Sequence, residues 1–550
     1  MSGKTIPICA AAMLLAGTAQ AQPAATVTVQ KQRHHHPRGM HNTVIRAHTA
    51  AVPESGGAAT VETPTGVPVA APATAGPSLE ERVRRLEEQL DAQREKEQAE
   101  HTRLTSLEQS FNDTQWSFDN ARPTVKSGDG RFTMSVRVRF QADQANFFQK
   151  DPHDPNNTAQ FKDLSSGAVV RRAFFGVEGK AFSDFWYELR FNAGGSNGGG
   201  GSPPGTEGDP VLSLARVAYL GIPNFELNAG VIEPAFMLEG TTSSGQLPFL
   251  ERPEIDNIAA DSFGAGDARR GIEARYQKTD TFLPGDNLVL GVDLTGAKTG
   301  SSGGHGNNGD EQTQIMAHGS YRVWSDGISN VSFGGDYSRA YTGGGIGAIN
   351  LQDRPEVRVN GDRLISTGSI FAKNADMWAV NGGANFENFY AGGEYANFSV
   401  DREAAFGGHT VDKPEFSGWY VEGTWVLTGE PKTYTVSATN NEVGGFGAPK
   451  VASPFSWSGN SWGAWEVAAR YSDTDLNWNE QAAVLADGLP GIAGGRERIV
   501  MLGLNWYLNN NIKLQLNDGF VHVDKLNAPG GTIQYGQNFN ELALRLQFTN

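Results

Sequence analysis

Residues Asp129–Phe140, D-G-R-F-T-M-S-V-R-V-R-F, alternate between polar and apolar side chains from Arg131 onward. The apolar positions are Phe132, Met134, Val136, Val138 and Phe140. The polar positions are Arg131, Thr133, Ser135, Arg137, Arg139 and then Gln141. Successive side chains of a strand point to opposite faces, so this stretch predicts a strand with one apolar and one polar face. The apolar face packs inward in a soluble sandwich, whereas in an outer-membrane barrel it meets lipid and the polar face lines water.

The same two-residue period continues from Asp119 to the end of the chain and predicts about sixteen strands. Early strands are expected within Arg172–Phe182, Phe185–Phe191, Ala215–Tyr219, Phe225–Ile232, Ile272–Tyr276 and Leu288–Thr295. Later strands centre on Ile315–Val323, Val331–Tyr337, Met377–Phe386, Phe389–Phe398, Ser417–Leu427, Trp465–Tyr471, Arg498–Tyr507, Ile512–Val523 and Glu541–Phe548. Short turns such as Pro223-Asn224 alternate with long glycine-rich connections such as Gly194–Asp209 and Gly296–Gly309. Short turns at one rim and long loops at the other are typical of outer-membrane barrels, whereas a sandwich spaces its strands more evenly.

The N-terminus has the features of an export signal. Met1–Ala21 combines Lys4, an apolar stretch at Ile8–Gly17 and an A-x-A cleavage site, which together predict a secretory signal peptide. The single cysteine of the chain, Cys9, lies inside this peptide, so the mature chain would have neither disulfides nor a thiol nucleophile. No later apolar run approaches the ~18 residues of a membrane helix, which excludes a helical membrane protein.

A tether and a helix are expected between the signal peptide and the barrel. Gln22–Pro77 is rich in Ala, Pro, Thr, Val and Gly and predicts a disordered linker. Residues 78–111 predict a helix capped by Ser78, with Glu81 completing a capping box. One heptad stripe carries Leu79, Val83, Leu86, Leu90, Leu104, Leu107 and Phe111. Because Gln93, Glu97 and Glu100 interrupt the stripe, we expect a short, weakened coiled coil that oligomerises; the alternative is a solvated single helix.

Composition and motifs argue against several functions. The chain carries 45 basic and 61 acidic residues, a net charge of −16, which opposes nucleic-acid binding. Adjacent histidines at His34–His36 lack fixed ligand geometry, and Asp151–Asp154 lacks the acidic spacing of a calcium loop. Two G-x-S-x-G matches, at Gly194–Gly198 and Gly459–Gly463, lack the helix that a nucleophile elbow requires after its serine. We therefore predict no enzyme, no metal site and no cofactor.

Arginines on the polar parity of early strands are the strongest functional signal. These are Arg137, Arg139, Arg172, Arg190, Arg216 and Arg275. In a closed barrel they would project into the lumen, where permanently charged guanidinium groups bind oxyanions and make anion pores. Alternatively, Glu178, Glu188 and Glu273 share their parity and would neutralise them as ordinary ion pairs. The sequence leaves both interpretations open.

Several segments carry a resemblance to the phosphate-selective porin O and P family. They include Asp129–Phe132, Arg171–Gly176, Gly230–Phe236, Phe249–Pro253, Leu427–Glu430, Gly463–Ser472 and Gly503–Leu508. The resemblance implies an outer-membrane homotrimer of 16-stranded barrels that conducts anions through pores narrowed by inward-folded loops. It points to Pro234–Pro253 as the constriction loop, with Glu233, Glu239, Glu251 and Arg252 in or beside it. This loop is acidic and holds no lysine cluster, a departure that leaves phosphate selectivity in question.

The leading functional hypothesis is a trimeric outer-membrane porin. It would pass small hydrophilic solutes through the lipid bilayer, with a preference for inorganic anions such as phosphate or polyphosphate-like oxyanions. The alternative is a non-selective or weakly cation-selective general porin, which the acidic balance favours. A third class is an outer-membrane enzyme or a tether that reaches periplasmic partners.

Overall fold

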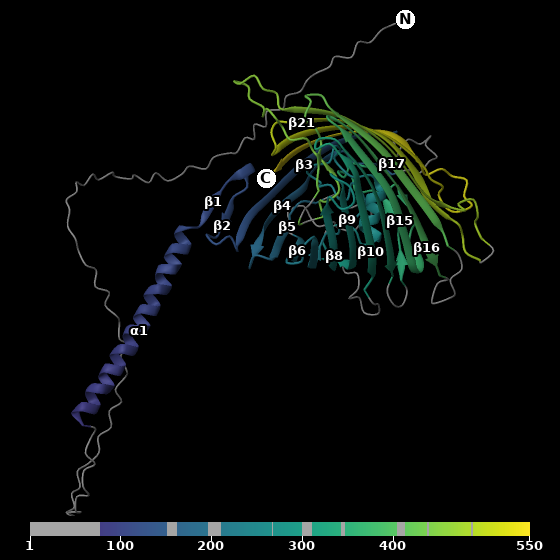
Figure 1. Cartoon of the computed structure of the whole chain (residues 1–550). Coiled ribbons are helices and arrows are strands. Elements are labelled where there is room, and N and C mark those ends of the chain that lie inside the picture. Colours follow the sequence, from purple (N-terminus) through teal and green to yellow (C-terminus); the bar gives the residue numbers. More distant parts are fainter. Residues whose placement is uncertain are drawn as a thin grey trace, which may run out of the picture. The chain divides into compact units, whose positions relative to one another are not determined.

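Figure 1 shows the computed structural model of the whole chain. The structure describes residues 78–150, 162–195, 211–266, 268–299, 311–342, 347–403, 413–436, 439, 441–485 and 488–550. The predicted signal peptide, linker and calcium-like stretch Asp151–Asp154 lie outside the described residues, as does part of the first G-x-S-x-G match. The chain divides into two compact units, residues 1–86 and 87–550.

The predicted N-terminal helix is present as α1, Leu79–Asn112. The backbone N–H of Glu81 donates to Ser78 Oγ at 3.2 Å, which satisfies one of the free amides of the first turn. The heptad leucines and Val83 are exposed, and the largest exposed fraction is 78%, at Leu79. The apolar stripe is therefore uncovered in a single chain, and its coiled-coil pairing stays a prediction. Neither α1 nor α2 (Glu254–Ser262) is long and apolar enough to cross a membrane.

Sixteen antiparallel strands form a closed barrel, as predicted. They are β3 (Thr133–Phe148), β4 (Gly167–Ala181), β5 (Phe185–Asn192), β6 (Val211–Tyr219), β7 (Phe225–Ile232), β8 (Arg269–Thr279), β9 (Asn287–Lys298), β10 (Thr313–Ser325), β11 (Asn330–Tyr341), β15 (Ile370–Phe386), β16 (Phe389–Arg402), β17 (Glu415–Val426), β20 (Ala464–Trp478), β21 (Ile492–Tyr507), β22 (Ile512–Asp524) and β23 (Asn538–Thr549). Each strand pairs with the next, and β23 closes on β3 through pairs such as Phe548 with Phe140. Closure leaves no free sheet edge.

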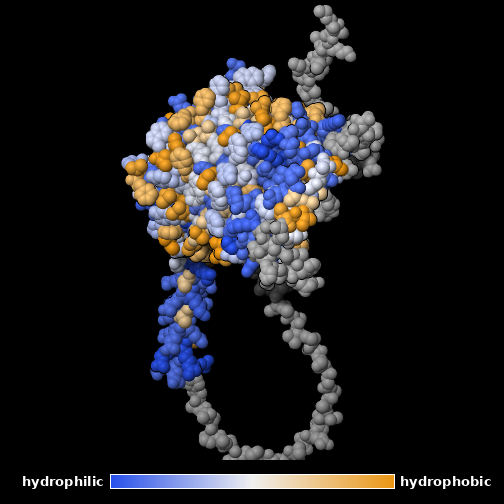
Figure 2. All heavy atoms as spheres, turned by 90° about the vertical axis from the view of Figure 1, so that its right-hand side faces the viewer, coloured by the Kyte–Doolittle hydropathy of each residue, from blue (hydrophilic) through white to orange (hydrophobic). Residues whose placement is uncertain are grey.

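The first barrel strand begins later than the stretch that predicts it. Asp129 Oδ1 accepts a hydrogen bond from the backbone N–H of Arg131 at 3.0 Å, so the D-G pair forms a turn. This turn joins the short β2 (Thr124–Lys126) to β3, and β2 also pairs with β1 (Gln115–Ser117) beyond the 3-10 turn Asp119–Ala121. Along β3, Met134 and Phe140 are exposed on the outer face, whereas Arg139 is buried on the inner face. In Figure 2 apolar side chains are spread over the barrel face turned to the viewer.

Connections between the strands alternate in length with one exception. Turns such as 182–184, 326–329 and 387–388 lie at one rim, and the longer loops lie at the other. The exception is the connection from β17 to β20, residues 427–463, which starts and ends at the rim of the short turns. It carries a two-stranded hairpin, β18 (Thr433–Tyr434) with β19 (Phe446–Gly447). We refer to residues 427–463 as the rim loop.

Two loops from the opposite rim fill much of the lumen. Residues 233–268, here called the lumen loop, include α2, and between 234 and 251 only Gly240 and Gln246 are not buried. Its apolar side chains, among them Phe236, Phe249 and Ile255, form a core with inward residues of the barrel wall. The second loop, residues 342–369, contains β12 (Ala348–Ile349), β13 (Gln352–Asp353) and β14 (Ile365–Ser366). The lumen is therefore a packed interior with cavities between the loops and the wall.

Candidate functional site

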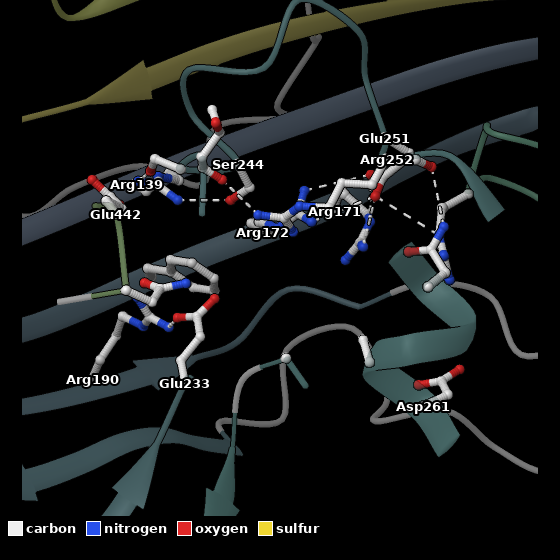
Figure 3. Close-up of a pocket in the computed structure, with 18 of the residues that line it drawn as sticks. Arg139, Arg171, Arg172, Arg190, Glu233, Ser244, Glu251, Arg252, Asp261 and Glu442 are labelled. Carbon is white, nitrogen blue, oxygen red and sulfur yellow. Dashed lines mark hydrogen bonds and ion pairs between the residues drawn. The ribbon is translucent and has the colours of Figure 1, made fainter. Parts of the chain in front are cut away.

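A cationic cavity of about 160 Å³ lies between the lumen loop and the wall made by β3, β4 and β5. Seven cationic side chains line it: Arg139, Arg171, Arg172, Arg190, Arg252, Lys298 and Arg358. Four acidic side chains line it as well: Glu233, Glu251, Asp261 and Glu442. Figure 3 shows Arg139, Arg172 and Arg171 in a row, with Arg190 and Glu233 on the other side of the cavity. The balance of charge at this site is thus opposite to that of the whole chain.

Arg139 is held at the inner wall by hydroxyl groups of the lumen loop. Its Nη1 donates to Ser244 Oγ at 2.7 Å and its Nη2 donates to Ser243 Oγ at 2.6 Å. The guanidinium carbon of Arg139 lies 5.6 Å from the ring centroid of Phe174, and that of Arg190 lies 4.7 Å from it. Because the ring faces attract cations, Phe174 stabilises two guanidinium groups close together. Hydroxyl groups and guanidinium groups are the donors that bind oxyanions.

A bulge in β4 brings two consecutive arginines into the same cavity. Gln141 of β3 pairs with Arg172, but the next residue, Ala142, pairs with Val170, so Arg171 is the extra residue. Without the bulge, Arg171 would face lipid by parity. Instead its Nε and Nη2 donate to the two carboxylate oxygens of Glu251 at 2.8 and 3.0 Å. Arg172 donates to Gln141 Oε1 at 2.9 Å and to Glu251 Oε1 at 3.4 Å.

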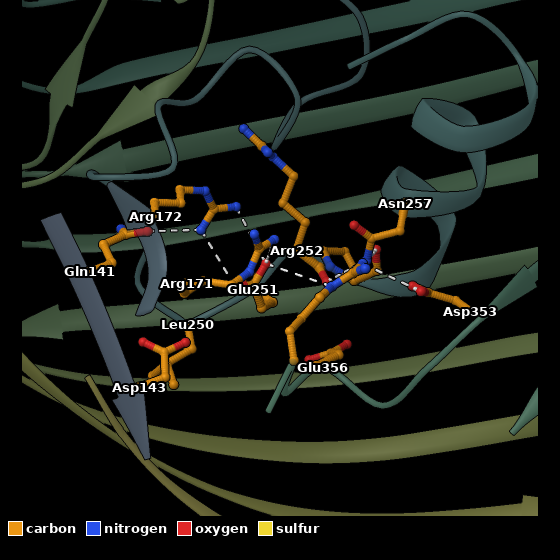
Figure 4. Close-up of polar contacts among 12 residues, drawn as sticks. Gln141, Asp143, Arg171, Arg172, Leu250, Glu251, Arg252, Asn257, Asp353 and Glu356 are labelled. Atoms are coloured by element: carbon orange, nitrogen blue, oxygen red, sulfur yellow. Dashed lines mark hydrogen bonds and ion pairs between the residues drawn. The ribbon is translucent and has the colours of Figure 1, made fainter. Parts of the chain in front are cut away.

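Glu251 anchors the lumen loop to the wall. Its Oε1 also accepts from Arg545 Nη2 of β23 at 2.8 Å, and its Oε2 lies 3.8 Å from Arg358 Nε. Figure 4 shows Glu251 beside Arg171 and Arg172. Burial alone would raise the pKa of Glu251, but the guanidinium groups of Arg171 and Arg172 hold it well below its usual range. The carboxylate is therefore ionised at any working pH and offsets part of the charge of four arginines.

Three of the six predicted pore arginines lie in a belt of alternating charges along the inner wall. The belt consists of Arg137, Glu178, Glu188, Arg216, Glu226, Arg275 and Glu273, on strands β3 to β8. Arg137 Nη1 lies 3.0 Å from Glu178 Oε2, and Arg216 Nη2 lies 3.1 Å from Glu188 Oε2. Arg275 has no exposed surface. Arg139, Arg172 and Arg190 line the cationic cavity, whereas Arg216 and Arg275 do not.

The predicted loop residues have different contacts. Glu233 lies 2.9 Å from Arg190 Nη2 at the cavity. Glu239 faces Arg470 of β20 at 3.4 Å, away from the cavity. Arg252 donates to the carbonyl oxygens of Glu239 and Thr242 at 2.8 and 2.6 Å, so it braces its own loop as well as lining the cavity. Their assignment to a constriction stays a prediction.

Sequence reasoning missed several residues of the site. Arg171 falls on the lipid-facing parity, and only the arginine doublet itself could have drawn attention to a bulge. Lys298 is the last residue of β9 and falls on the parity of the lipid-facing Leu290 and Leu294. Arg358 lies in a long loop, where no period places a side chain. Glu442 comes from the rim loop, which the short-turn pattern predicts to be brief. Among the described residues, no group of three or more His, Cys, Asp or Glu side chains could hold a metal ion.

A second cavity adjoins the first toward the rim of the short turns. Its cationic lining residues are Arg122, Arg137, Arg139, Lys450 and Lys513. The two cavities share Arg139, Ser243 and Glu442. The inner wall of β3 therefore carries cationic side chains from the lumen loop to this rim.

Comparison with known proteins identifies the family. A family model described as "Phosphate-selective porin O and P" matches residues 136–549, most of the chain and nearly the whole barrel. The chain belongs to the phosphate-selective porin O and P family. It is thus an outer-membrane porin, which confirms the resemblance seen in the sequence.

Individual relatives of this porin are distant. It is 24% identical to Porin O of Pseudomonas aeruginosa over 437 residues, which cover 74% of this chain and 87% of that protein. An anion-selective porin from Comamonas acidovorans matches in structure with a TM-score of 0.41 and 11% identity, covering 76% of this chain and 100% of the other. The outer membrane channel DcaP of Acinetobacter baumannii matches with a TM-score of 0.40 and 11% identity, covering 77% and 99%.

Proposed function

We propose that this porin passes small hydrophilic solutes with a preference for anions, and that phosphate or polyphosphate-like oxyanions bind in its cationic cavity. The observation that carries the proposal is the excess of cations at the cavity, seven against four, in a chain that is acidic overall. Low-dielectric walls focus this local charge and raise the concentration of anions in the lumen. The description of the family as phosphate-selective supports the same function.

The chemistry of the lining suits transient binding. An anion between Arg139 and Arg190 would exchange part of its hydration for guanidinium donors and the hydroxyl groups of Ser243 and Ser244. Glu233 already compensates part of the charge of Arg190, with 2.9 Å between carboxylate and guanidinium. Conduction requires binding that is favourable enough for entry and weak enough for release. Partial compensation of the arginines by carboxylates meets this requirement, because it limits how tightly each site binds an anion.

A general or weakly cation-selective pore is the second candidate. The observation that favours it is a group of acidic side chains on the other side of the lumen loop, around Arg470. Glu239, Glu356 and Glu422 all lie within 4 Å of this guanidinium. However, all three are buried, and none lines the cationic cavity. We therefore favour the anion pore.

We also propose that the porin is a homotrimer held partly by α1. The exposed heptad stripe of Val83, Leu86 and Leu90 is the supporting feature, since a partner helix would cover it. A polar stretch around Glu97 limits the strength of this pairing. The proposal concerns assembly only, because each barrel closes on its own strands.

Reversal potentials in planar bilayers test the proposed selectivity. With a KCl gradient across the membrane, an anion-preferring pore gives a reversal potential of the sign set by the chloride gradient. Phosphate added to KCl should also reduce the chloride current in a saturable way, because it competes for the cationic cavity. A reversal potential of zero or of the potassium sign would instead establish the general or cation-selective porin.

A further inference from the structure

We propose that Glu442 of the rim loop is a specificity-determining residue, a fixed carboxylate at the junction of the two cationic cavities that speeds the release of bound anions. The inference rests on the proposed anion function and adds a residue that neither strand parity nor the lumen loop supplies. Glu442 belongs to a loop that enters the barrel from the rim of the short turns, whereas Ser243 and Ser244 belong to the lumen loop, which enters from the opposite rim.

The backbone around Glu442 is fixed on both sides. Asn441 Nδ2 donates to the carbonyl oxygen of Gly240 in the lumen loop at 3.2 Å. Val443 has no exposed surface and packs with Ala235 and Val289. Glu442 between them is only half-buried and lines both cavities, whereas Asn441 lines the cationic cavity but not the second one.

The hairpin behind Glu442 is anchored as well. Phe446 of β19 packs against Tyr390 of β16 with ring centroids 4.9 Å apart, and against Tyr434 of β18 at 5.1 Å. Thr242 Oγ1 of the lumen loop donates to the carbonyl oxygen of Phe446 at 3.3 Å. Buried aromatic pairs of this kind contribute to stability beyond their buried area. The carboxylate is therefore presented from a packed support.

Position and charge distinguish Glu442 from the other acidic residues of the cationic cavity. Glu251 is enclosed by arginines and Asp261 lies 2.6 Å from Lys298, and neither of these two residues lines the second cavity. Glu442 is the single acidic side chain among the described residues that line the second cavity, against five cations. Its charge acts on Arg122, Arg137 and Arg139 together. Figure 3 shows its carboxylate beside the guanidinium group of Arg139.

A carboxylate in this position opposes the binding of an anion at Arg139 and Ser243. The anion gains from the guanidinium groups and loses to like-charge repulsion by Glu442, so its residence at the junction is shortened. If the charge of Glu442 were removed, anions would bind at the junction more tightly and leave more slowly. The effect acts on binding at the junction and needs no movement of the rim loop.

The test is phosphate block of the chloride current, together with reversal potentials, for Glu442→Gln, Glu442→Asp and a matched control. The control is Glu387→Gln, which removes an exposed carboxylate from the turn between β15 and β16 at the same rim. For Glu442→Gln we expect half-block at a phosphate concentration roughly 3- to 30-fold lower, with screening setting the value in this range. Its reversal potential should move further in the anion direction. Glu442→Asp and Glu387→Gln should behave like the wild type.

Three results would overturn the inference. One is an unchanged half-blocking concentration in Glu442→Gln. Another is a larger conductance without tighter block, which would show that Glu442 merely holds the rim loop in place. The third is an aspartate variant that behaves like the glutamine variant. If the wild type lacks anion preference, the proposed function fails, whereas the Glu442 inference is judged only from the difference between variant and wild type.

Discussion

Arg171 and Glu251 form a two-pronged ion pair from a bulge on β4 to the loop that fills the lumen, with N–O distances of 2.8 and 3.0 Å. The bulge matters because it turns a lipid-facing position inward, and the pair matters because it fixes the lumen loop against the wall. Arg545 of β23 holds the same carboxylate from the other side of the barrel seam. One loop residue thus connects β4, the second barrel strand, with β23, the last.

Removing the charge of Glu251 should destabilise the loop and the barrel. Glu251→Gln leaves Arg171, Arg172 and Arg545 with less counter-charge in a buried place, and breaking such a buried pair costs roughly 3–5 kcal/mol. The temperature at which the barrel unfolds, followed by its heat-dependent mobility in SDS gels, should fall. Glu415→Gln, at the exposed start of β17, is the control and should leave it unchanged. Equal unfolding temperatures for Glu251→Gln and wild type would contradict the anchoring role.

The acidic N-terminus of α2 should make stability depend on pH. Burial, with the nearby Glu356 and Glu497, raises the pKa of Glu254 well above its usual range. The folded state therefore keeps this proton after the unfolded chain releases it, near pH 4, and folding loses stability as pH rises. Glu254→Gln removes this loss. It should be more stable than wild type by about 1.4 kcal/mol for each pH unit above about 4, up to the folded-state pKa.

Unfolding by guanidinium chloride at pH 4 and at pH 8 tests this dependence. The two proteins should have equal unfolding free energies at pH 4, and Glu254→Gln should exceed the wild type at pH 8. Asp256→Asn should change in the same direction, since burial raises the pKa of Asp256 too. A stability difference that does not vary with pH would show that the substitution acts through packing alone.

The heptad stripe of α1 should contribute to assembly. Val83→Asp with Leu90→Asp places charges in the expected helix–helix contact, where they would be buried against partner helices. The trimer should dissociate at a lower temperature in native gels, while single-channel conductance stays the same. Thr102→Asp, on the opposite side of the helix by heptad position, is the control. A trimer of unchanged stability would leave α1 as a solvated single helix.

The fold could be predicted from the sequence because each barrel strand repeats the alternation of apolar and polar side chains seen from Phe132 to Phe140. This alternation extends over the whole barrel because one face of every strand meets lipid and the other faces the lumen. The inward positions of Arg139, Arg172 and Arg190 follow from the same period. The bulge at Arg171 does not, because one extra residue changes parity without an independent signal. Nor do Arg358 and Glu442, since long loops have no period and their positions depend on tertiary packing. Parity also predicts that Arg275 and Arg139 both face the lumen. It does not predict that Arg275 is buried in ion pairs whereas Arg139 lines the cationic cavity.

This difference between Arg139 and Arg275 allows the central claim to be tested most directly. We would measure reversal potentials in a KCl gradient for wild type, Arg139→Gln with Arg190→Gln, and Arg275→Gln. The account predicts an anion-selective wild type, a clear loss of that selectivity in the double variant, and retained selectivity in Arg275→Gln, whose guanidinium is fully buried between Glu226 and Glu273. A double variant with the wild-type reversal potential would contradict the claim that the cationic cavity selects anions.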